Sequence, residues 1–308
     1  MLVLDDLSTG RLENVEHLLE SDRFEFVEGS MLDAEVVDEC LADVDRVLHL
    51  ASAVGVKLIV AEPLNSLLRN VRGNDIVMSA AAKRKRFLLF TSTSEVYGKN
   101  GAGPLSEGAD RLLGPTHSPR WAYANAKAFG EALAHHYHRE QGTPTVVTRL
   151  FNTVGPRQTG AYGMVLPRFV EQALAGDDLT VYGNGTQTRC FCHVQDTVAA
   201  LLAVLDCDEA VGQTLNVGAS EEIPVVELAR RVIERVDSPS TIRLVPYEEA
   251  YGDDFEEMLR RQPDTSALRE LTGWRPRRTV DDAIDEVAAR ATARLAAPVA
   301  RPARNGVR

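Results

Sequence analysis

Residues 87–98, FLLFTSTSEVYG, join an apolar run to a group of hydroxyl and carboxylate side chains. The run FLLF has no polar interruption, which is typical of a parallel strand that is buried on both faces. Val47–Ala51 (VLHLA) has the same character. Polar side chains directly after such a strand lie at the carboxyl edge of the sheet, where ligands of these folds bind. The segment therefore predicts a buried parallel strand and a site at its end.

The same alternation of β-rich and helical segments extends over the first half of the chain. We predict strands at 2–5, 24–28, 45–50, 87–92 and 144–150, and helices at 12–20, 34–41, 63–83 and 123–141. Strands separated by helical stretches are joined by crossover connections, which give a parallel sheet with helices on both faces. The predicted fold class is α/β, with a doubly wound parallel sheet.

The character of the sequence changes after about residue 155, where Gly and Pro become frequent and single strands are expected at 179–182 and 242–245. We expect residues 1–155 to form the first domain and residues 156–290 a smaller α/β domain at the carboxyl ends of the strands. Segments around 194–217 are expected to return to the first sheet. Residues 291–308 mix Ala, Arg and Pro without core periodicity and predict a disordered tail.

Composition excludes several classes of protein. The chain has 308 residues and a formal net charge of −11, which argues against nucleic acid as a partner. No apolar run reaches the ~18 residues of a membrane span, and the first residues lack a basic signal region, so we expect a cytoplasmic protein without a membrane contact. Neither the CFCH segment at 190–193 nor the histidines at 135, 136 and 138 have a second group of ligands, so no metal site is expected.

Two groups of residues predict chemistry. Tyr123 and Lys127 are four residues apart on a predicted helix and share one face. A nearby ammonium, together with an oxidised nicotinamide ring, favours a phenolate, so Tyr123 could act as a general base, although such pairs also arise on solvated helices. Thr93 or Ser94 could bind a substrate hydroxyl, and Glu95 could exchange protons or meet substrate charge. The alternative for these three is an ordinary turn at a helix start.

Charged residues elsewhere predict binding. Asp5 ends the opening strand, where dinucleotide folds hold ribose hydroxyls, although it could equally cap a turn. Arg189 and Arg261 could clamp a diphosphate bidentately, although each alone could be a surface charge.

Six motifs in order resemble the extended short-chain dehydrogenase/reductase family, in particular its NAD-dependent nucleotide-sugar epimerases, dehydratases and decarboxylases. The resemblance covers Leu2 to about Val287. It implies a Rossmann-like NAD-binding domain, a smaller domain that binds a nucleoside-diphosphate sugar, usually a UDP-sugar, and a homodimer formed through helices 63–83 and 121–141. The motifs are STSEVYG (92–98), RWAYANAK (120–127), RLFNTVGPRQTG (149–160), GNGTQTRCFCHVQDTV (183–198), LNVG (215–218) and RRQPDTSALRELTGW (260–274).

The resemblance also implies roles for individual residues. NAD would oxidise the sugar at C4 while Tyr123 removes the hydroxyl proton, with Lys127 and Thr93 or Ser94 completing the catalytic triad. The residues implied for NAD are Asp5, Ala51, Ser52, Asn70, Tyr123 and Lys127, and those implied for the sugar nucleotide are Asn152, Arg189 and Arg261.

The reaction that follows oxidation distinguishes the classes within the family. Dehydratases carry an Asp-Glu pair after S-T, and Ser94 stands at the first of these positions, which counts against a dTDP-glucose 4,6-dehydratase. UDP-glucuronate decarboxylases carry S-E-V-Y-G and R-W-x-Y, which match Ser94–Gly98 and Arg120–Tyr123. We therefore expect a UDP-glucuronate decarboxylase-like enzyme, in which Glu95 and Arg261 manage the substrate carboxylate and protonation at C5. UDP-glucose 4-epimerase is the alternative.

One departure from the family pattern concerns the strand and glycine-rich turn whose backbone amides bind the NAD pyrophosphate. Residues 1–308 contain no such turn. We expect free edges on the neighbouring strands and poor binding of NAD by the polypeptide. Either the start codon lies upstream, by the roughly thirty residues of a βα unit, or the chain is a truncated, non-catalytic sugar-nucleotide-binding remnant. We favour the first explanation because the other site residues are present.

Overall fold

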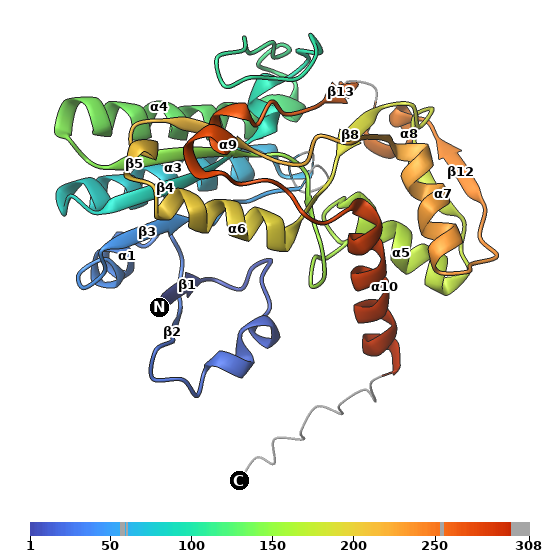
Figure 1. Ribbon diagram of the computed structural model, residues 1–308, viewed down its shortest axis with the longest axis horizontal. Helices are drawn as coiled ribbons and strands as arrows, with labels where there is room; N and C mark the ends of the chain where they lie inside the picture. Colours follow the sequence, from blue (N-terminus) through green and yellow to red (C-terminus); the bar gives the residue numbers. More distant parts are fainter. Residues whose placement is uncertain (56–58, 60, 253–255, 297–308) are drawn as a thin grey trace.

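The central sheet of the computed structural model has four parallel strands (Figure 1). The structure describes residues 1–55, 59, 61–252 and 256–296. The strands lie in the order β10–β5–β4–β3, with β4 at Phe87–Thr93, β5 at Thr145–Leu150, β3 at Arg46–His49 and β10 at Thr214–Val217. The predicted strand at 87–92 is therefore confirmed as a central strand, paired on both edges.

Helices cover both faces of this sheet, as predicted. Alternate residues of β4 enter different cores: Leu88 and Phe90 pack with one cluster, and Leu89 packs with another. The first cluster includes residues of α1 (Ala34–Cys40), α3 (Pro63–Lys83) and α4 (Ala122–Gln141), and the second includes α6 (Val194–Leu205) and α9 (Ser266–Thr272). Figure 1 shows α4 and α6 on opposite sides of the sheet. The α/β class and the doubly wound arrangement are confirmed.

The opening strands form a separate sheet. β1 (Leu2–Asp5) and β2 (Glu25–Glu28) pair in parallel with each other and, among the described residues, with no strand of the central sheet. The edge of β3 that faces away from β4 is likewise unpaired among these residues. Leu48 and Leu50, at the end of β3, are 38% and 54% exposed. The expectation of free edges on β1 and β3 is confirmed.

Two predicted segments differ from the structure. Residues 12–20, predicted as one helix, form two short 3-10 turns at Leu12–Asn14 and Glu16–Leu18, because no residue in them is buried and neither turn has a side-chain N-cap. Residues 291–296, predicted within a disordered tail, belong instead to α10 (Val280–Ala296), where Ala291 packs against the core of the smaller half. The rest of the predicted tail, residues 297–308, lies outside the described residues.

The remaining elements form the smaller half of the molecule. Its core joins α5, α7 and α10 to β7. β7 pairs with β12, β8 lies between β11 and β13, and β6 pairs with β9. β10 pairs with β5, so part of the segment 194–217 lies in the central sheet. Its elements are β6 (Thr153–Val154), α5 (Val165–Ala175), β7 (Leu179–Tyr182), β8 (Thr188–Cys190), β9 (Cys192–His193), β11 (Glu222–Pro224), α7 (Val225–Arg235), β12 (Ile242–Val245), α8 (Tyr247–Tyr251) and β13 (Arg260–Arg261). Elsewhere in the chain, 3-10 turns lie at Ser94–Tyr97, Pro119–Trp121 and Asp208–Ala210.

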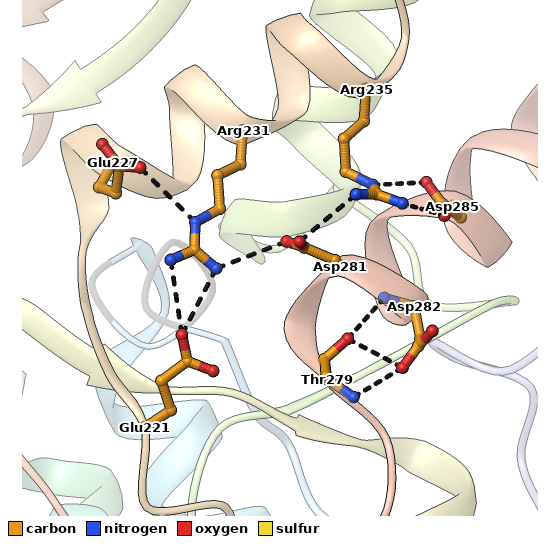
Figure 2. A network of polar contacts seen from close by, with 8 residues as sticks. All are labelled: Glu221, Glu227, Arg231, Arg235, Thr279, Asp281, Asp282 and Asp285. Carbon is orange, nitrogen blue, oxygen red and sulfur yellow. Dashed lines mark hydrogen bonds and ion pairs between the residues drawn. The ribbon is translucent and has the colours of Figure 1, made fainter.

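Ion pairs fix α10 against α7 (Figure 2). Arg231 and Arg235 of α7 both reach Asp281, at 3.5 and 3.3 Å, and Arg235 also binds Asp285. Thr279 caps the helix, since its hydroxyl accepts from the Asp282 amide at 3.2 Å and its own amide donates to the Asp282 carboxylate at 2.8 Å. These partly exposed pairs orient α10 more than they stabilise it. No helix in the described ranges is long and apolar enough to cross a membrane.

Candidate active site

A cavity of about 410 Å³ lies at the carboxyl ends of β4 and β5. On one side it is lined by residues that follow these strands, including Thr93 and Asn152. On the other side it is lined by the smaller half, including Arg189 of β8 and Arg261 of β13. Residues that are far apart in the sequence thus meet at the sheet edge where ligands of parallel folds bind.

Tyr123 and Lys127 both line this cavity from the first turns of α4. Their exposed fractions are 6% and 2%. The Lys127 ammonium donates to the carbonyl of Thr91 at 2.8 Å and lies 4.8 Å from the centre of the Phe90 ring. The side chain of Lys127 is therefore anchored to β4, beside the strand end that carries the hydroxyl residues.

Burial controls the protonation of this pair. It lowers the pKa of Lys127 to about 7, against the attraction of Glu131. Burial also raises the pKa of Tyr123 above its usual range, and the charge of Glu95 adds to the effect, while a hydrogen bond with Ser52 opposes it. The residues of the chain alone thus hold Tyr123 as a phenol. Among these residues desolvation dominates, and the role of Tyr123 as a general base stays a prediction.

The turn after β4 carries the hydroxyl residues and Glu95. The Thr93 hydroxyl accepts a hydrogen bond from the Glu95 amide at 3.2 Å, so Thr93 caps the 3-10 turn Ser94–Tyr97. The Ser94 hydroxyl accepts from Arg261 Nη1 at 3.3 Å. The segment is therefore a capped turn and also part of the cavity lining, so the two interpretations of it are compatible.

Glu95 lies between two buried arginines. Arg120 Nη1 donates to Glu95 Oε2 at 2.7 Å, and Arg261 Nη1 lies 3.6 Å from Glu95 Oε1. Burial alone raises the pKa of Glu95, but the charges of Arg120 and Arg261 outweigh it, so its pKa lies below the usual range. Burial and the repulsion of Arg189 lower the pKa of Arg261 to about 10. All three groups are therefore charged at neutral pH.

Arg189 forms a second ion pair in the same cavity. Its Nη2 donates to Glu257 Oε1 at 2.7 Å, and its Nη1 donates to the carbonyl of Thr188 at 2.7 Å. We call Glu95, Arg120, Arg189, Glu257 and Arg261 the charged cluster. The sequence did not predict five residues of the cavity lining, because none of them stands at a position to which the motifs assign a role. They are Glu257, Arg168 and the tyrosines at 182, 247 and 251.

The described lining is positively charged, although the whole chain is acidic. It contains two carboxylates, those of Glu95 and Glu257. Against these stand five basic side chains, those of Arg120, Lys127, Arg168, Arg189 and Arg261. In a chain of net charge −11, such a lining indicates a site for an anionic ligand.

Three predicted cofactor residues do not line the cavity. Asp5 is exposed at the end of β1, where its carboxylate accepts from the Leu7 amide at 2.8 Å, as a turn cap does. Ala51 lies in the loop after β3. The buried Asn70 organises that loop, because its Oδ1 accepts from the Ser52 hydroxyl at 2.8 Å and from the Ala53 amide at 2.9 Å. Ser52 itself lines the cavity.

The doubly wound sheet and the tyrosine–lysine pair at its carboxyl edge define an extended short-chain dehydrogenase/reductase. The chain belongs to the GDP-mannose 4,6 dehydratase family, whose sequence model matches residues 2–287. The resemblance found in the sequence motifs is thereby confirmed, and with it the assignment of the chain to a family of enzymes.

Two curated relatives of the chain are decarboxylases. The chain is 41% identical over 248 residues to the UDP-N-acetyl-alpha-D-glucosaminuronate decarboxylase of Bacillus cytotoxicus, covering 80% of this chain and 76% of that protein. It is 35% identical over 274 residues to UDP-glucuronic acid decarboxylase 1 of Xenopus tropicalis, covering 89% of this chain and 62% of that protein. The chain thus spans less than two thirds of this second relative.

Solved structures confirm the Rossmann-like fold. The epimerase Mth375 of Methanothermobacter thermautotrophicus has a TM-score of 0.86 and 28% identity, over 96% of this chain and 85% of that one. The dTDP-glucose 4,6-dehydratase DesIV of Streptomyces venezuelae, solved with NAD and TYD bound, has a TM-score of 0.83 and 28% identity, over 93% of this chain and 85% of that one.

The buried lysine makes stability depend on pH. Because the pKa of Lys127 is about 7 when folded, the unfolded chain binds more protons between pH ~7 and ~10, and the free energy of unfolding rises with pH in that window. We expect Lys127→Met to remove this rise. The free energy of unfolding of wild type minus that of the variant, measured by urea denaturation, should increase by about 2–3 kcal/mol from pH ~7 to ~9.5. A difference that stays constant with pH contradicts the burial of a titrating Lys127.

Proposed function

We propose that the chain is an NAD-dependent decarboxylase of a UDP-linked uronic acid, which oxidises the sugar at C4 before the carboxyl group leaves. The observation that carries the proposal is the pairing of two buried arginines, Arg120 and Arg261, with the single carboxylate of Glu95 beside Tyr123. Arg261 Nε is buried and has no hydrogen-bond partner among the described residues. A sugar carboxylate would supply an acceptor for Arg261 Nε and a further negative charge beside the arginines.

The residues around Tyr123 suit one end of the cofactor. Ser52, Thr91, Tyr123 and Lys127 line one part of the cavity and would hold the nicotinamide end, with Asn70 fixing Ser52. The described residues include no glycine-rich turn for the pyrophosphate, so the fit is to that end alone. When bound there, NAD would supply a hydride acceptor for the sugar C4 and a cationic ring that favours the Tyr123 phenolate.

The chain's own groups handle the proton and the carboxylate. Tyr123 takes the proton of the C4 hydroxyl as C4 is oxidised, and the Thr93 hydroxyl, whose oxygen is fixed by the Glu95 amide, is free to donate to the substrate. The resulting β-keto acid loses carbon dioxide readily, because the C4 carbonyl receives the electron pair. The enolate then takes up a proton from water at C5, and return of the hydride to C4, with the Tyr123 proton to its oxygen, would give the UDP-pentose. Since the pKa of Glu95 is lowered, we assign Glu95 to orienting Arg120 and Arg261 rather than to protonating C5.

Turnover of UDP-glucuronate tests this function. With NAD at millimolar concentration, chosen because we expect weak cofactor binding, we expect carbon dioxide and a UDP-pentose. Tyr123→Phe should lower the rate by about 10²–10⁴-fold, since it removes the group that exchanges the proton. Tyr137→Phe, on the same helix but outside the cavity, is the matched control and should keep the wild-type rate. Conversion to the C4 epimer without carbon dioxide, or no conversion, would reject a decarboxylase.

The proposed enzyme is a homodimer that pairs α3 and α4 of two copies. These helices pack side by side, and Leu64 and Leu68 of α3 and Phe129 of α4 expose 67%, 36% and 43% of their surface. Apolar side chains on adjacent helices form a face that a second copy can cover.

Light scattering after size exclusion tests the dimer. The wild-type chain should elute at about twice the chain mass of 33.7 kDa. Phe129→Asp should give the monomer, because it would bury a charge in the interface. Leu202→Asp, at a 53% exposed position of α6, should leave the dimer intact. A monomeric wild type rules out this interface.

A further inference from the structure

We propose that Glu257 determines the charge selectivity of the nucleotide site. Its carboxylate pairs with Arg189 as an internal counter-ion, and a diphosphate must displace this carboxylate to bind. This inference rests on the proposed function, since it assumes that a nucleoside diphosphate binds in the cavity. It adds a residue that sets how strongly the site favours a charged ligand over a neutral one.

The geometry places Glu257 where a ligand anion would bind. Glu257 Oε1 accepts from Arg189 Nη2 at 2.7 Å and from the Met258 amide at 2.7 Å, and the Tyr247 side chain also hydrogen-bonds to Glu257. The side chains of Arg189 and Glu257 are 7% and 17% exposed, and both line the cavity. A phosphate that binds Arg189 therefore meets the carboxylate of Glu257 at contact distance.

The charges nearby explain why the cavity carries this carboxylate. Arg189 and Arg120 lie close enough to Arg261 to act on it, since burial and their charges lower the pKa of Arg261 against the charges of Glu95 and Glu257. Glu95 is engaged by Arg120 and Arg261. Glu257 is thus the carboxylate that balances Arg189. Without a ligand the pair keeps a buried charge compensated, which isolated buried charges require.

A ligand gains binding energy at Arg189 only by replacing Glu257 as the partner of the guanidinium. A diphosphate offers several negative charges and bidentate acceptors, so it can exchange with Glu257. A neutral nucleoside has no group that competes for the guanidinium. Removing the charge of Glu257 should therefore strengthen binding of a nucleoside diphosphate and leave binding of the nucleoside unchanged. If Glu257 were only a support for the cavity wall, its replacement would weaken both ligands.

The test compares UDP with uridine on three forms of the full chain. The variant Glu257→Gln keeps the size of the side chain and can still accept from Met258. Glu256→Gln is the matched control, because it removes the same charge one residue away, where Glu256 binds Trp121 and Lys99 outside the cavity lining. Affinities are measured by calorimetric titration for UDP and by competition against UDP for uridine.

We expect Glu257→Gln to bind UDP about tenfold more tightly than wild type, with uridine affinity unchanged, and Glu256→Gln to match wild type. Unchanged or weaker UDP binding by Glu257→Gln, with wild type binding UDP, overturns the role of Glu257 alone. An equal change for UDP and uridine also overturns it, because charge would not be the cause. Failure of wild type and both variants to bind UDP overturns the proposed function together with this inference.

Discussion

The ion pairs of Glu95 with Arg120 and Arg261 are the interaction on which the cavity depends. Glu95 follows β4, Arg120 precedes α4, and Arg261 lies on β13 in the smaller half, so one carboxylate joins three distant segments. Buried charges are tolerated only when they are paired, so these segments must stay together. The same pairing keeps Glu95 ionised and leaves an excess of positive charge beside Tyr123, which fits an acidic sugar.

A second buried network joins α4 to the central sheet. Glu131 of α4 accepts from Arg149 of β5 at 2.7 Å and from Ser92 of β4 at 2.5 Å, while the Tyr97 hydroxyl donates to Asn216 of β10 at 2.8 Å. Three strands and the helix that carries Tyr123 are thereby held in one arrangement. The charge of Glu131 also opposes the loss of the proton from Lys127. Fold stability and the chemistry of the tyrosine–lysine pair thus share the same contacts.

Much of the fold and part of the site could be predicted from the sequence, because the periodicity of strands and helices is a local property. Most predicted strands and helices of the first half lie within one residue of the observed bounds, and the rule for parallel strand ends places Thr93 and Asn152 at the cavity. Protonation could not be predicted, because the pKa of Tyr123 depends on burial rather than on its spacing from Lys127. The pairing of Arg189 with Glu257 joins residues 68 apart and follows no periodicity.

The preference for an acidic sugar is the most direct test of the account. Calorimetric titration of the chain with UDP-glucuronate and with UDP-glucose compares two ligands that differ in oxidation at sugar C6. A hydrogen-bonded carboxylate at a buried arginine contributes about 1.5–3 kcal/mol, so we predict that UDP-glucuronate binds at least tenfold more tightly. Equal affinities, or tighter binding of UDP-glucose, would contradict the assignment of Arg120 and Arg261 to the sugar carboxylate.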